Sequence, residues 1–292
     1  MVKLSIIVLS FNTPELVVSC VDSLTKIYQD ELVAHEFEIL IFDNASSDGS
    51  VKVLQKTYGK TPHIEILASK KNLGFGKGNN EAAKKASGKY LLFLNSDTLV
   101  EDRGLLGMVS YLDANSHIGV LGGKLQNADG TSQKSAGSYY KLFNVFLMLL
   151  GGERLGLLRY SPNMTVAVDW VSGAALMISK ELFTSLSGFD SNIFMYMEDM
   201  ELCFRVEKTG RETYFFPDVT IKHMGHGSSN RTFAVVNIYE GILYFYRKHM
   251  PSWQYRVVLF LLKTKAHILS KLGTITGNRY LRETYEKALT VC

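Results

Sequence analysis

The chain has 292 residues, of which 46% are hydrophobic and 21% charged, and its net charge is +4. This composition is ordinary for a globular α/β protein with ample apolar material for a core. The low net charge and the lack of any recognised nucleic-acid module argue against a nucleic-acid partner. The three cysteines show no metal or redox spacing, and their odd number argues against a disulfide framework.

The positive charge is concentrated at the C-terminal end. From Arg247 to Cys292 there are nine Lys/Arg against two Asp/Glu, a local charge of +7, and the remaining residues carry 23 against 26, or −3. Met1 leads directly into a strand-like segment with no signal-peptide pattern, so we expect a reducing cytoplasm. No apolar run reaches the ~18 residues that a spanning helix needs.

The first hundred residues alternate between strand and helix patterns. The segment 4–9 is apolar on both faces, as in a buried strand, and Thr13 followed by Pro14 marks a helix start. Further strands are predicted at 38–42, 64–67 and 90–94, and further helices at 51–58 and 80–86. This alternation predicts a doubly wound, mostly parallel α/β sheet with ligands outside the carboxyl ends of its strands.

Beyond residue 118 the alternation is less regular. The predicted elements are a strand–turn–strand at 168–179, a helix at 198–208, a strand at 214–221, and closing helices at 233–249 and 253–272. No repeat or low-complexity linker divides the chain. We therefore predict one domain, residues 1–230, with a C-terminal helical extension, residues 231–292.

Polar side chains follow the predicted strands. Asn12, Asp43, Asp48 and Asp97 each come after one, so they should converge on one crevice. For Asp48 taken alone, a cap at the start of the next helix is the favoured alternative.

A glycine-rich stretch follows the third predicted strand, with glycines at 74, 76 and 78. A loop of this kind lets backbone N–H groups approach a phosphate or sugar, and the alternative is a flexible connector. It does not match the dinucleotide fingerprint, because Asn79 stands where the last glycine would be.

Seven short motifs occur in a fixed order. They are Ser10–Asn12, Asp43–Ser50, Asn72–Asn79, Asn95–Asp97, Gly188–Asp190, Glu198–Leu202 and His223–Ser228. This succession resembles the family-2 inverting glycosyltransferases of the GT-A fold, especially their rhamnosyltransferase-like branch. The resemblance covers roughly residues 3 to 230 and implies that this part is a GT-A domain.

The resemblance implies a nucleotide-sugar site at the strand ends. Asp43 would accept hydrogen bonds from the nucleotide base, for which an ionised carboxylate is suited, and Asp48 would help shape that pocket. The nucleotide-sugar-binding residues implied are Ser10, Asn12, Asp43, Asn44, Asp48, Asn72, Gly74, Gly76, Gly78, Asn79, Asn95 and Ser96.

The resemblance also implies a metal site. Asn95–Asp97 takes the place of the family's D-x-D motif, so Asp97 would hold Mg²⁺ or Mn²⁺ against the donor diphosphate. Asn95 replaces the first carboxylate of that motif, and we expect weak metal affinity without nucleotide. A capped helix start is the alternative for this motif. His223 would be a further ligand through a neutral imidazole nitrogen, with His226 as the competing candidate.

By motif match Asp199 is the catalytic base, and Glu198 beside it helps to place the acceptor. Acidic residues in a first helical turn are also stabilised by the helix dipole without any catalytic role. Trp170 lies where the family places the wall of the sugar pocket, although it could equally be a core residue.

These expectations combine into one activity. The branch resemblance implies transfer of L-rhamnose from dTDP-rhamnose, or of a sugar from a UDP-sugar, to a saccharide or polyprenyl-linked acceptor in cell-surface polysaccharide synthesis. The basic, aromatic C-terminal helices fit peripheral contact with the inner face of the cell membrane, with ordinary helix packing or oligomer contact as the alternative.

Three rival functions fit less well. A sugar nucleotidyltransferase carries its glycine-rich loop directly after the first strand, where this chain has Ser10–Asn12. A nicotinamide-dependent oxidoreductase needs the dinucleotide fingerprint, which is absent. A non-catalytic nucleotide-sugar-binding relative would lack the base or a metal ligand, whereas Asp97, Asp199 and His223 are all present.

Overall fold

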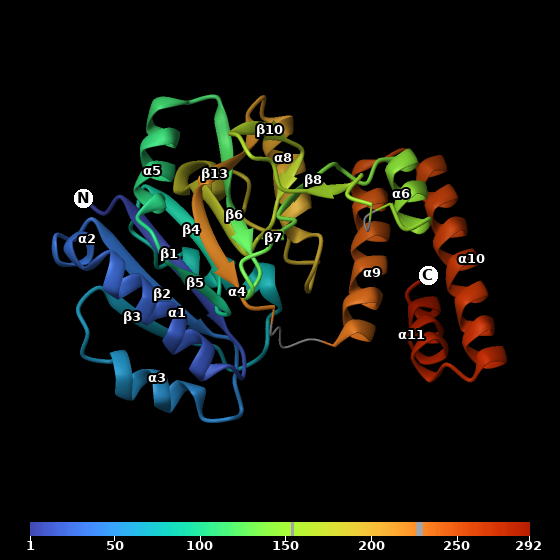
Figure 1. Ribbon diagram of the computed structural model, residues 1–292, viewed down its shortest axis with the longest axis horizontal. Coiled ribbons are helices and arrows are strands. Elements are labelled where there is room, and N and C mark those ends of the chain that lie inside the picture. Colours follow the sequence, from blue (N-terminus) through green and yellow to red (C-terminus); the bar gives the residue numbers. More distant parts are fainter. Residues whose placement is uncertain (153–154, 226–229) are drawn as a thin grey trace.

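The computed structural model describes residues 1–152, 155–225 and 230–292. Figure 1 shows an α/β body that contains the chain's first half, with a group of helices at one end. The helices are α1 (Pro14–Ile27), α2 (Gln29–Val33), α3 (Ser50–Tyr58), α4 (Phe75–Ala83), α5 (Gly104–Ala114), α6 (Leu142–Leu149), α7 (Lys180–Ser185), α8 (Glu198–Lys208), α9 (Arg231–His249), α10 (Ser252–Thr276) and α11 (Arg279–Thr290).

Most of the strands belong to one large sheet. The strands are β1 (Leu4–Ser10), β2 (Phe37–Asp43), β3 (Ile64–Ala68), β4 (Tyr90–Asn95), β5 (Thr98–Val100), β6 (Ile118–Gln126), β7 (Ser132–Gln133), β8 (Ala136–Gly137), β9 (Arg159–Tyr160), β10 (Val166–Val168), β11 (Trp170–Val171), β12 (Ala175–Ser179) and β13 (Glu212–His223). The large sheet has the order β10-β13-β6-β12-β4-β1-β2-β3, and β11-β8-β9 form a small second sheet.

The parallel, doubly wound half is the one that the sequence predicts. Strands β3, β2, β1 and β4 are parallel neighbours, whereas β12 runs antiparallel to both β4 and β6. In the parallel half Ser10 pairs with Asp43, and Leu9 pairs with Asn95. The ends of three strands therefore meet at one edge of the sheet.

Apolar residues cover both faces of the central strands. Ile6 and Val8 point toward a cluster that includes residues of α1, α3 and α5, while Ile7 and Phe93 point toward a cluster with residues of α4, α8 and α9. Successive side chains of a strand point to opposite faces. This explains why the strand 4–9 has no polar alternation.

Strand β13 contains an irregularity. Its pairing with β6 jumps from Phe216 opposite Gly123 to Thr220 opposite Lys124. Pro217 lies in the interval and has no N–H to donate to the ladder, so a bulge is expected there. Beyond the bulge β13 also pairs with β5, and His223 lies opposite Thr98.

Three sequence expectations need correction. Helix α4 begins at Phe75 rather than Asn80, so most of the glycine-rich stretch is helix rather than loop. Strand β13 runs two residues beyond the strand predicted at 214–221, so His223 is its last residue. A third closing helix, α11, follows the two that were expected.

Close packing of α4 against its neighbours explains why a glycine-rich stretch forms a helix here. A Cβ on Gly76 would lie 2.9 Å from Cβ of Phe189, and one on Gly78 would lie 2.7 Å from Cδ1 of Leu9. Only glycine lets the helix come this close to its neighbours.

The C-terminal helices pack on the α/β body. Ile242, Phe245 and Tyr246 of α9 are fully buried and belong to the same apolar cluster as β4 and α8. Among the described residues no helix is both long and apolar enough to cross a bilayer. The division at residue 230 stays a prediction.

Candidate active site

A cleft of about 800 Å³ opens at the carboxyl ends of β1 and β4, between them and the first turns of α8 and α9. Ten of the predicted site residues line it: Asn44, Asn72, Gly74, Asn95, Ser96, Asp97, Trp170, Glu198, Asp199 and His223. The other seven do not: Ser10, Asn12, Asp43, Asp48, Gly76, Gly78 and Asn79. The predicted base and metal ligands therefore share one cavity.

Three buried oxygens lie without a described partner where β1 and β2 end. They are Ser10 Oγ, Thr13 Oγ1 and Asp43 Oδ2. The other oxygen of Asp43, Oδ1, accepts a hydrogen bond from the Ser46 amide at 2.9 Å. A buried polar atom left unpaired is unfavourable, so a ligand that formed hydrogen bonds with these atoms would stabilise them. The Thr13 hydroxyl, expected to cap α1, makes no such bond.

Asn12 and Asp48 organise the loops around that group. Asn12 adopts a φ of 53°, and its Oδ1 accepts the Ser47 amide at 2.8 Å, which joins the loop after β1 to the loop after β2. Asp48 is exposed and accepts the Ser50 amide at 3.0 Å at the start of α3. These contacts account for both residues as loop-forming groups.

Asn44 holds the turn before α4 in place. Its Nδ2 donates to Asn72 Oδ1 at 3.0 Å and to the Gly74 carbonyl at 3.1 Å. Gly74 has a φ of +79°, and a Cβ there would lie 2.2 Å from the Phe194 carbonyl oxygen. Asn79, by contrast, donates to the Phe75 carbonyl within α4, so packing accounts for it as it does for Gly76 and Gly78.

Asp97 and His223 face each other across the β5–β13 pairing. His223 Nε2 lies 3.2 Å from Asp97 Oδ1 and 3.2 Å from Asn95 Nδ2. Both side chains are largely shielded from solvent, with exposed fractions of 8% for Asp97 and 18% for His223.

A chain of hydrogen bonds fixes the proton on His223. The Thr131 hydroxyl donates to Asp129 at 2.6 Å, so its oxygen accepts from Asn127 Nδ2 at 2.9 Å. Asn127 Oδ1 accepts from Gln133 Nε2 at 3.0 Å, which leaves Gln133 Oε1 only 2.6 Å from His223 Nδ1. An amide oxygen only accepts, so Nδ1 carries a hydrogen; in the neutral imidazole Nε2 then presents a lone pair toward Asp97 and the Asn95 amide.

This pair fits a divalent cation. Two acceptor atoms 3.2 Å apart repel unless a cation or proton lies between them, and adjacent ligands of an octahedral ion at ~2.1 Å are ~3.0 Å apart. Within the described residues no third His, Cys, Asp or Glu joins the pair, so further ligands would come from the donor, water or the Asn95 amide. His226, the competing ligand, lies outside the described residues.

Glu198 and Asp199 open helix α8 beside the cleft. Asp199 Oδ2 accepts the Gly173 amide at 3.0 Å and Oδ1 accepts the Met200 amide at 2.8 Å, whereas Glu198 Oε2 is buried without a partner among the described residues. Burial raises the pKa of both carboxyls, and the charge of Asp199 raises the pKa of Glu198 further, to about 8. The two amide bonds favour ionised Asp199. Glu198 therefore holds the proton, and Asp199 is free to accept one.

Trp170 and Arg159 form the opposite wall. Trp170 is 4% exposed, its Nε1 donates to the Ser138 carbonyl at 3.1 Å, and the Arg159 guanidinium lies 5.2 Å from its ring centre. Arg159 Nε is buried and makes no hydrogen bond with any described residue. Trp170 thus serves as both core and wall.

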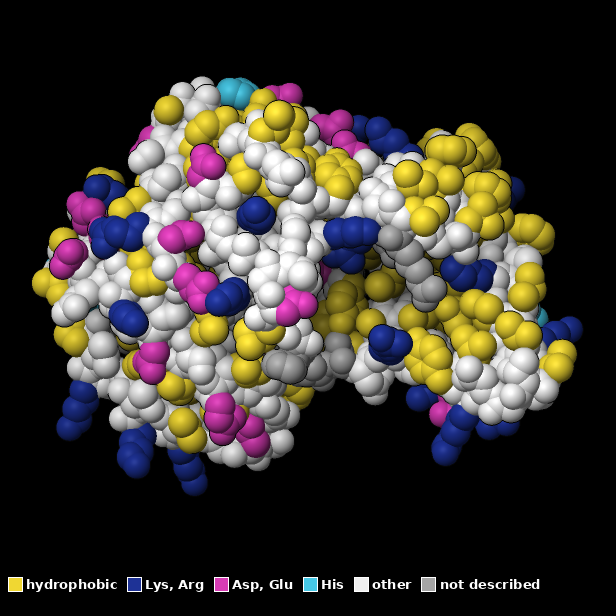
Figure 2. All heavy atoms as spheres, viewed as in Figure 1, with side chains coloured by type: hydrophobic (Ala, Val, Ile, Leu, Met, Phe, Trp, Pro, Cys, Tyr) yellow, Lys and Arg dark blue, Asp and Glu magenta, His cyan; other side chains and the backbone are white. Residues whose placement is uncertain are grey.

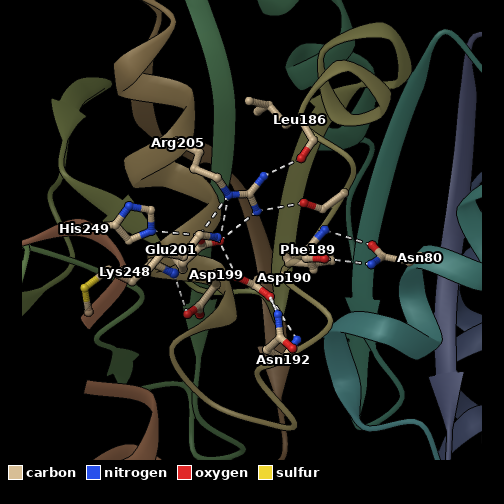
Figure 3. Close-up of polar contacts among 12 residues, drawn as sticks. Asn80, Leu186, Phe189, Asp190, Asn192, Asp199, Glu201, Arg205, Lys248 and His249 are labelled. Carbon is tan, nitrogen blue, oxygen red and sulfur yellow. Dashed lines mark hydrogen bonds and ion pairs between the residues drawn. The ribbon is translucent and has the colours of Figure 1, made fainter. Parts of the chain in front are cut away.

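A buried charge network holds α8 in position (Figure 3). Glu201, fully buried, accepts bonds from Arg205, from Lys248 at 2.8 Å and from His249 at 3.0 Å. Burial raises the Glu201 pKa, but these bonds outweigh it and hold the pKa at about 2. The network therefore ties α9 to the helix that carries Asp199.

The same network clamps the Gly188–Asp190 motif. Arg205 Nη2 donates to the Gly188 carbonyl at 2.7 Å, and Lys248 donates to Asp190 at 2.6 Å. Asn80 of α4 binds both the N–H and the carbonyl of Phe189 at 2.8 Å. The motif thus joins three helices around the cleft without lining it.

Several residues of the site were not predicted from the sequence. Arg159, which lines the cleft, and Gln133, which contacts His223, lie in two-residue strands that no periodic pattern marks. The aromatic residues Tyr140, Phe194 and Phe233 also line the cleft.

The fold matches solved glycosyltransferase structures and is of the GT-A type. A structure titled GalNAc-T7 with UDP, GalNAc and Mn²⁺ superposes with a TM-score of 0.64 at 15% identity, covering 99% of this chain and 54% of that one. The mannosyltransferase PcManGT from Pyrobaculum calidifontis, in complex with GDP-Man and Mn²⁺, gives 0.59 at 14% identity, with 99% and 85% covered.

The chain belongs to glycosyl transferase family 2, whose model matches residues 5–173. It is 27% identical over 169 residues to rhamnosyltransferase WbbL of Escherichia coli K12, covering 55% of this chain but only 64% of WbbL. It is also 27% identical over 221 residues to the N-acetylglucosaminyl-diphospho-decaprenol L-rhamnosyltransferase of Mycobacterium tuberculosis H37Rv, covering 66% of this chain and 68% of the relative. The family and fold predictions are confirmed.

Proposed function

We propose that the chain is an inverting, metal-dependent glycosyltransferase. It transfers a sugar from a nucleotide diphosphate to a hydroxyl of a saccharide or polyprenyl-linked saccharide in cell-surface polysaccharide synthesis. One observation carries the proposal: Asp97, His223 and Asp199, from three distant parts of the chain, line the same cleft.

Asp199 is the proposed base. Its carboxylate accepts the proton of the acceptor hydroxyl as that oxygen attacks the anomeric carbon of the donor. The bond from that carbon to the diphosphate oxygen breaks at the same time, so the configuration inverts and the diphosphate leaves with the electron pair. The amides of Gly173 and Met200 hold the carboxylate still for this task.

Asp97 and His223 would hold Mg²⁺ or Mn²⁺ at the leaving group. A bound cation would supply positive charge against the departing diphosphate. Gln133 keeps the Nε2 lone pair of His223 directed at that place, and a donor diphosphate would complete the ligand set. Metal affinity without nucleotide is therefore weak.

The donor proposed is dTDP-rhamnose, with a UDP-sugar as the second choice, because the similar proteins from E. coli and M. tuberculosis are named rhamnosyltransferases. The unpaired oxygen of Asp43 and the hydroxyls of Ser10 and Thr13 suit the N–H group of a pyrimidine base. A polyprenyl-linked acceptor would bring the protein to the inner face of the cell membrane.

Two substitutions separate the proposed roles. Asp199→Asn should slow transfer by about 10²–10⁴-fold, as expected for loss of a general base, while dTDP affinity measured by calorimetry with Mn²⁺ stays the same. Asp97→Ala should remove the Mn²⁺ dependence of dTDP binding. Unchanged turnover in the first variant, or an unchanged Mn²⁺ effect in the second, would contradict the assignment.

A thermal-shift panel of sugar nucleotides, with dTDP-rhamnose and UDP-sugars, identifies the donor.

A further inference from the structure

Helix α10 has two apolar faces, although packing against the protein needs only one. Its inner face buries Val258, Leu262 and Ala266 completely. Its outer face carries five exposed residues at helical spacing, Trp253, Val257, Phe260, Ile268 and Ile275, of which Phe260 is 68% and Ile275 83% exposed. Positions three, four and seven or eight apart share one side of a helix, so these residues form a stripe directed away from the protein.

Helix α6 extends this stripe into a surface. Phe143, Phe146 and Leu150 are exposed at the same kind of spacing, while Val145 on the other side of α6 is buried. Lys265 of α10 donates to the Leu149 carbonyl at 3.1 Å, which joins the two helices. Figure 2 shows hydrophobic side chains gathered over α6 and along α10, at the end remote from the β-sheet. We call this the α6–α10 surface.

The charged residues of α10 are of one sign, and α6 has none. Helix α10 has four Lys/Arg, at 256, 263, 265 and 271, and no Asp or Glu. Arg256 and Lys263 are exposed, and helical spacing places them beside the apolar stripe. Helix α6 has no charged residue and is preceded by Lys141. Apolar side chains bordered by cations, with no carboxylate in either helix, complement a surface that is apolar below and anionic above.

We propose that the α6–α10 surface lies in the interface of an anionic lipid bilayer. The apolar stripe enters the acyl boundary, and the flanking Lys and Arg meet the lipid phosphates. A contiguous apolar surface on a water-exposed protein is a binding site as a rule. The proposal thereby assigns the membrane contact to two packed helices and not to the basic charge of the tail alone.

The position of the surface also suits the proposed function, on which this one step rests. Tyr140 lines the cleft and lies two residues before α6, and its carbonyl accepts the Tyr246 hydroxyl of α9 at 2.7 Å. The wall of the cleft is thus continuous with the α6–α10 surface. An acceptor carried by a lipid would approach the cleft from that side.

Tryptophan fluorescence can test the proposal without an added label. It has two tryptophans, and Trp170 is 4% exposed whereas Trp253 is 58% exposed. Vesicles of phosphatidylcholine with phosphatidylglycerol should shift the Trp253 emission to shorter wavelength, and brominated lipids should quench it. Vesicles of phosphatidylcholine alone should bind at least tenfold more weakly, and added salt should narrow that difference.

The decisive variant is Phe260→Ser with Ile268→Ser, which keeps Trp253. It should bind anionic vesicles at least tenfold more weakly than the parent protein. The matched control is Val33→Ser with Val53→Ser, which removes two exposed apolar side chains from α2 and α3 and should bind as the parent does. Both variants should retain Mn²⁺-dependent dTDP affinity, since neither touches the cleft.

Three results would overturn the proposal. The first is that the parent protein does not bind the vesicles, and the second is that the Phe260/Ile268 variant binds them as well as its control does. The third is a dimer in light scattering that this variant alone abolishes, because the surface would then belong to a second copy of the chain. Failure of the Asp199 and Asp97 tests would overturn the enzymatic function and leave this result standing.

Discussion

At the scale of single residues, the site depends on protons whose positions are set by neighbours. Gln133 directs the His223 lone pair toward Asp97, and Glu198 holds the proton that Asp199 must be without. Orientation of a ligand by its hydrogen-bond partner commonly changes metal affinity by 10–100-fold.

Gln133 therefore has a measurable positioning role. Gln133→Leu should weaken Mn²⁺ binding by about 10–100-fold when dTDP is present, as followed by Mn²⁺ electron paramagnetic resonance. Gln133→Glu keeps an acceptor for the Nδ1 hydrogen and should retain most of the affinity. Nitrogen chemical shifts of His223 should report a mixture of tautomers only in the leucine variant. Equal Mn²⁺ affinity in all three proteins would show that the bond has no such role.

At the scale of elements, helix α8 is held by buried charge as well as by apolar contacts. Glu201 is fully buried and faces Arg205, Lys248 and His249, of which Lys248 is 36% exposed. Removing one partner of a buried ion pair leaves the others without compensation, which destabilises proteins by about 3–5 kcal/mol. The position of Asp199 depends on this group.

Glu201→Gln should accordingly lower the free energy of unfolding by about 3 kcal/mol or more, measured in urea at pH 7. The control is Glu81→Gln, which breaks an exposed pair with Lys84 and should change stability by less than ~1 kcal/mol. A similar small effect from both substitutions would contradict the buried-network account.

The lowered pKa values of the carboxyls in this network predict a loss of folding stability in acid. The pKa of Glu201 is lowered from 4.5 to about 2, and that of Asp190 from 3.8 to about 2. A lowered pKa contributes stability that is complete above the unfolded-state value and is lost as the pH falls through the folded-state value. The stability difference between the parent protein and Glu201→Gln should therefore shrink between about pH 4.5 and 2. A difference that stays constant over this range would assign the effect to packing.

At the scale of the whole molecule, the C-terminal helices contribute to the cleft and to the charge network that holds α8. Phe233, Ala234 and Ile238 of α9 line the cleft, and Lys248 and His249 complete the network around Glu201. The predicted boundary at residue 230 follows the change in sequence pattern, and these contacts of α9 join the residues on its two sides.

A chain ending at residue 230 should therefore fail to fold cooperatively, because the side chains that cover α8 would be missing. A chain ending at residue 278 lacks only α11 and should keep a sigmoidal thermal transition and Mn²⁺-dependent dTDP binding. Circular dichroism and calorimetry check both. A cooperative transition in the shorter protein would confirm that residues 1–230 fold as a domain without the extension.

The parallel half of the fold was predictable because each strand and helix there shows its own period and short connections fix their order. The site was predictable where a motif follows a strand, as with Asp97, or opens a helix, as with Asp199. Gln133 and Arg159 were not predictable, because their roles arise from pairing between distant segments. The glycines of α4 were misassigned because loop and close helix packing use the same residue.

The bulge around Pro217 decides on which side of β13 His223 emerges. Side chains of a strand alternate between faces, so a change of one residue in the interval 217–219 would send every later side chain of β13 to the opposite side. His223 would then point away from Asp97, although both residues would still be present in the sequence. A single-residue deletion there would thus inactivate the protein with every motif intact.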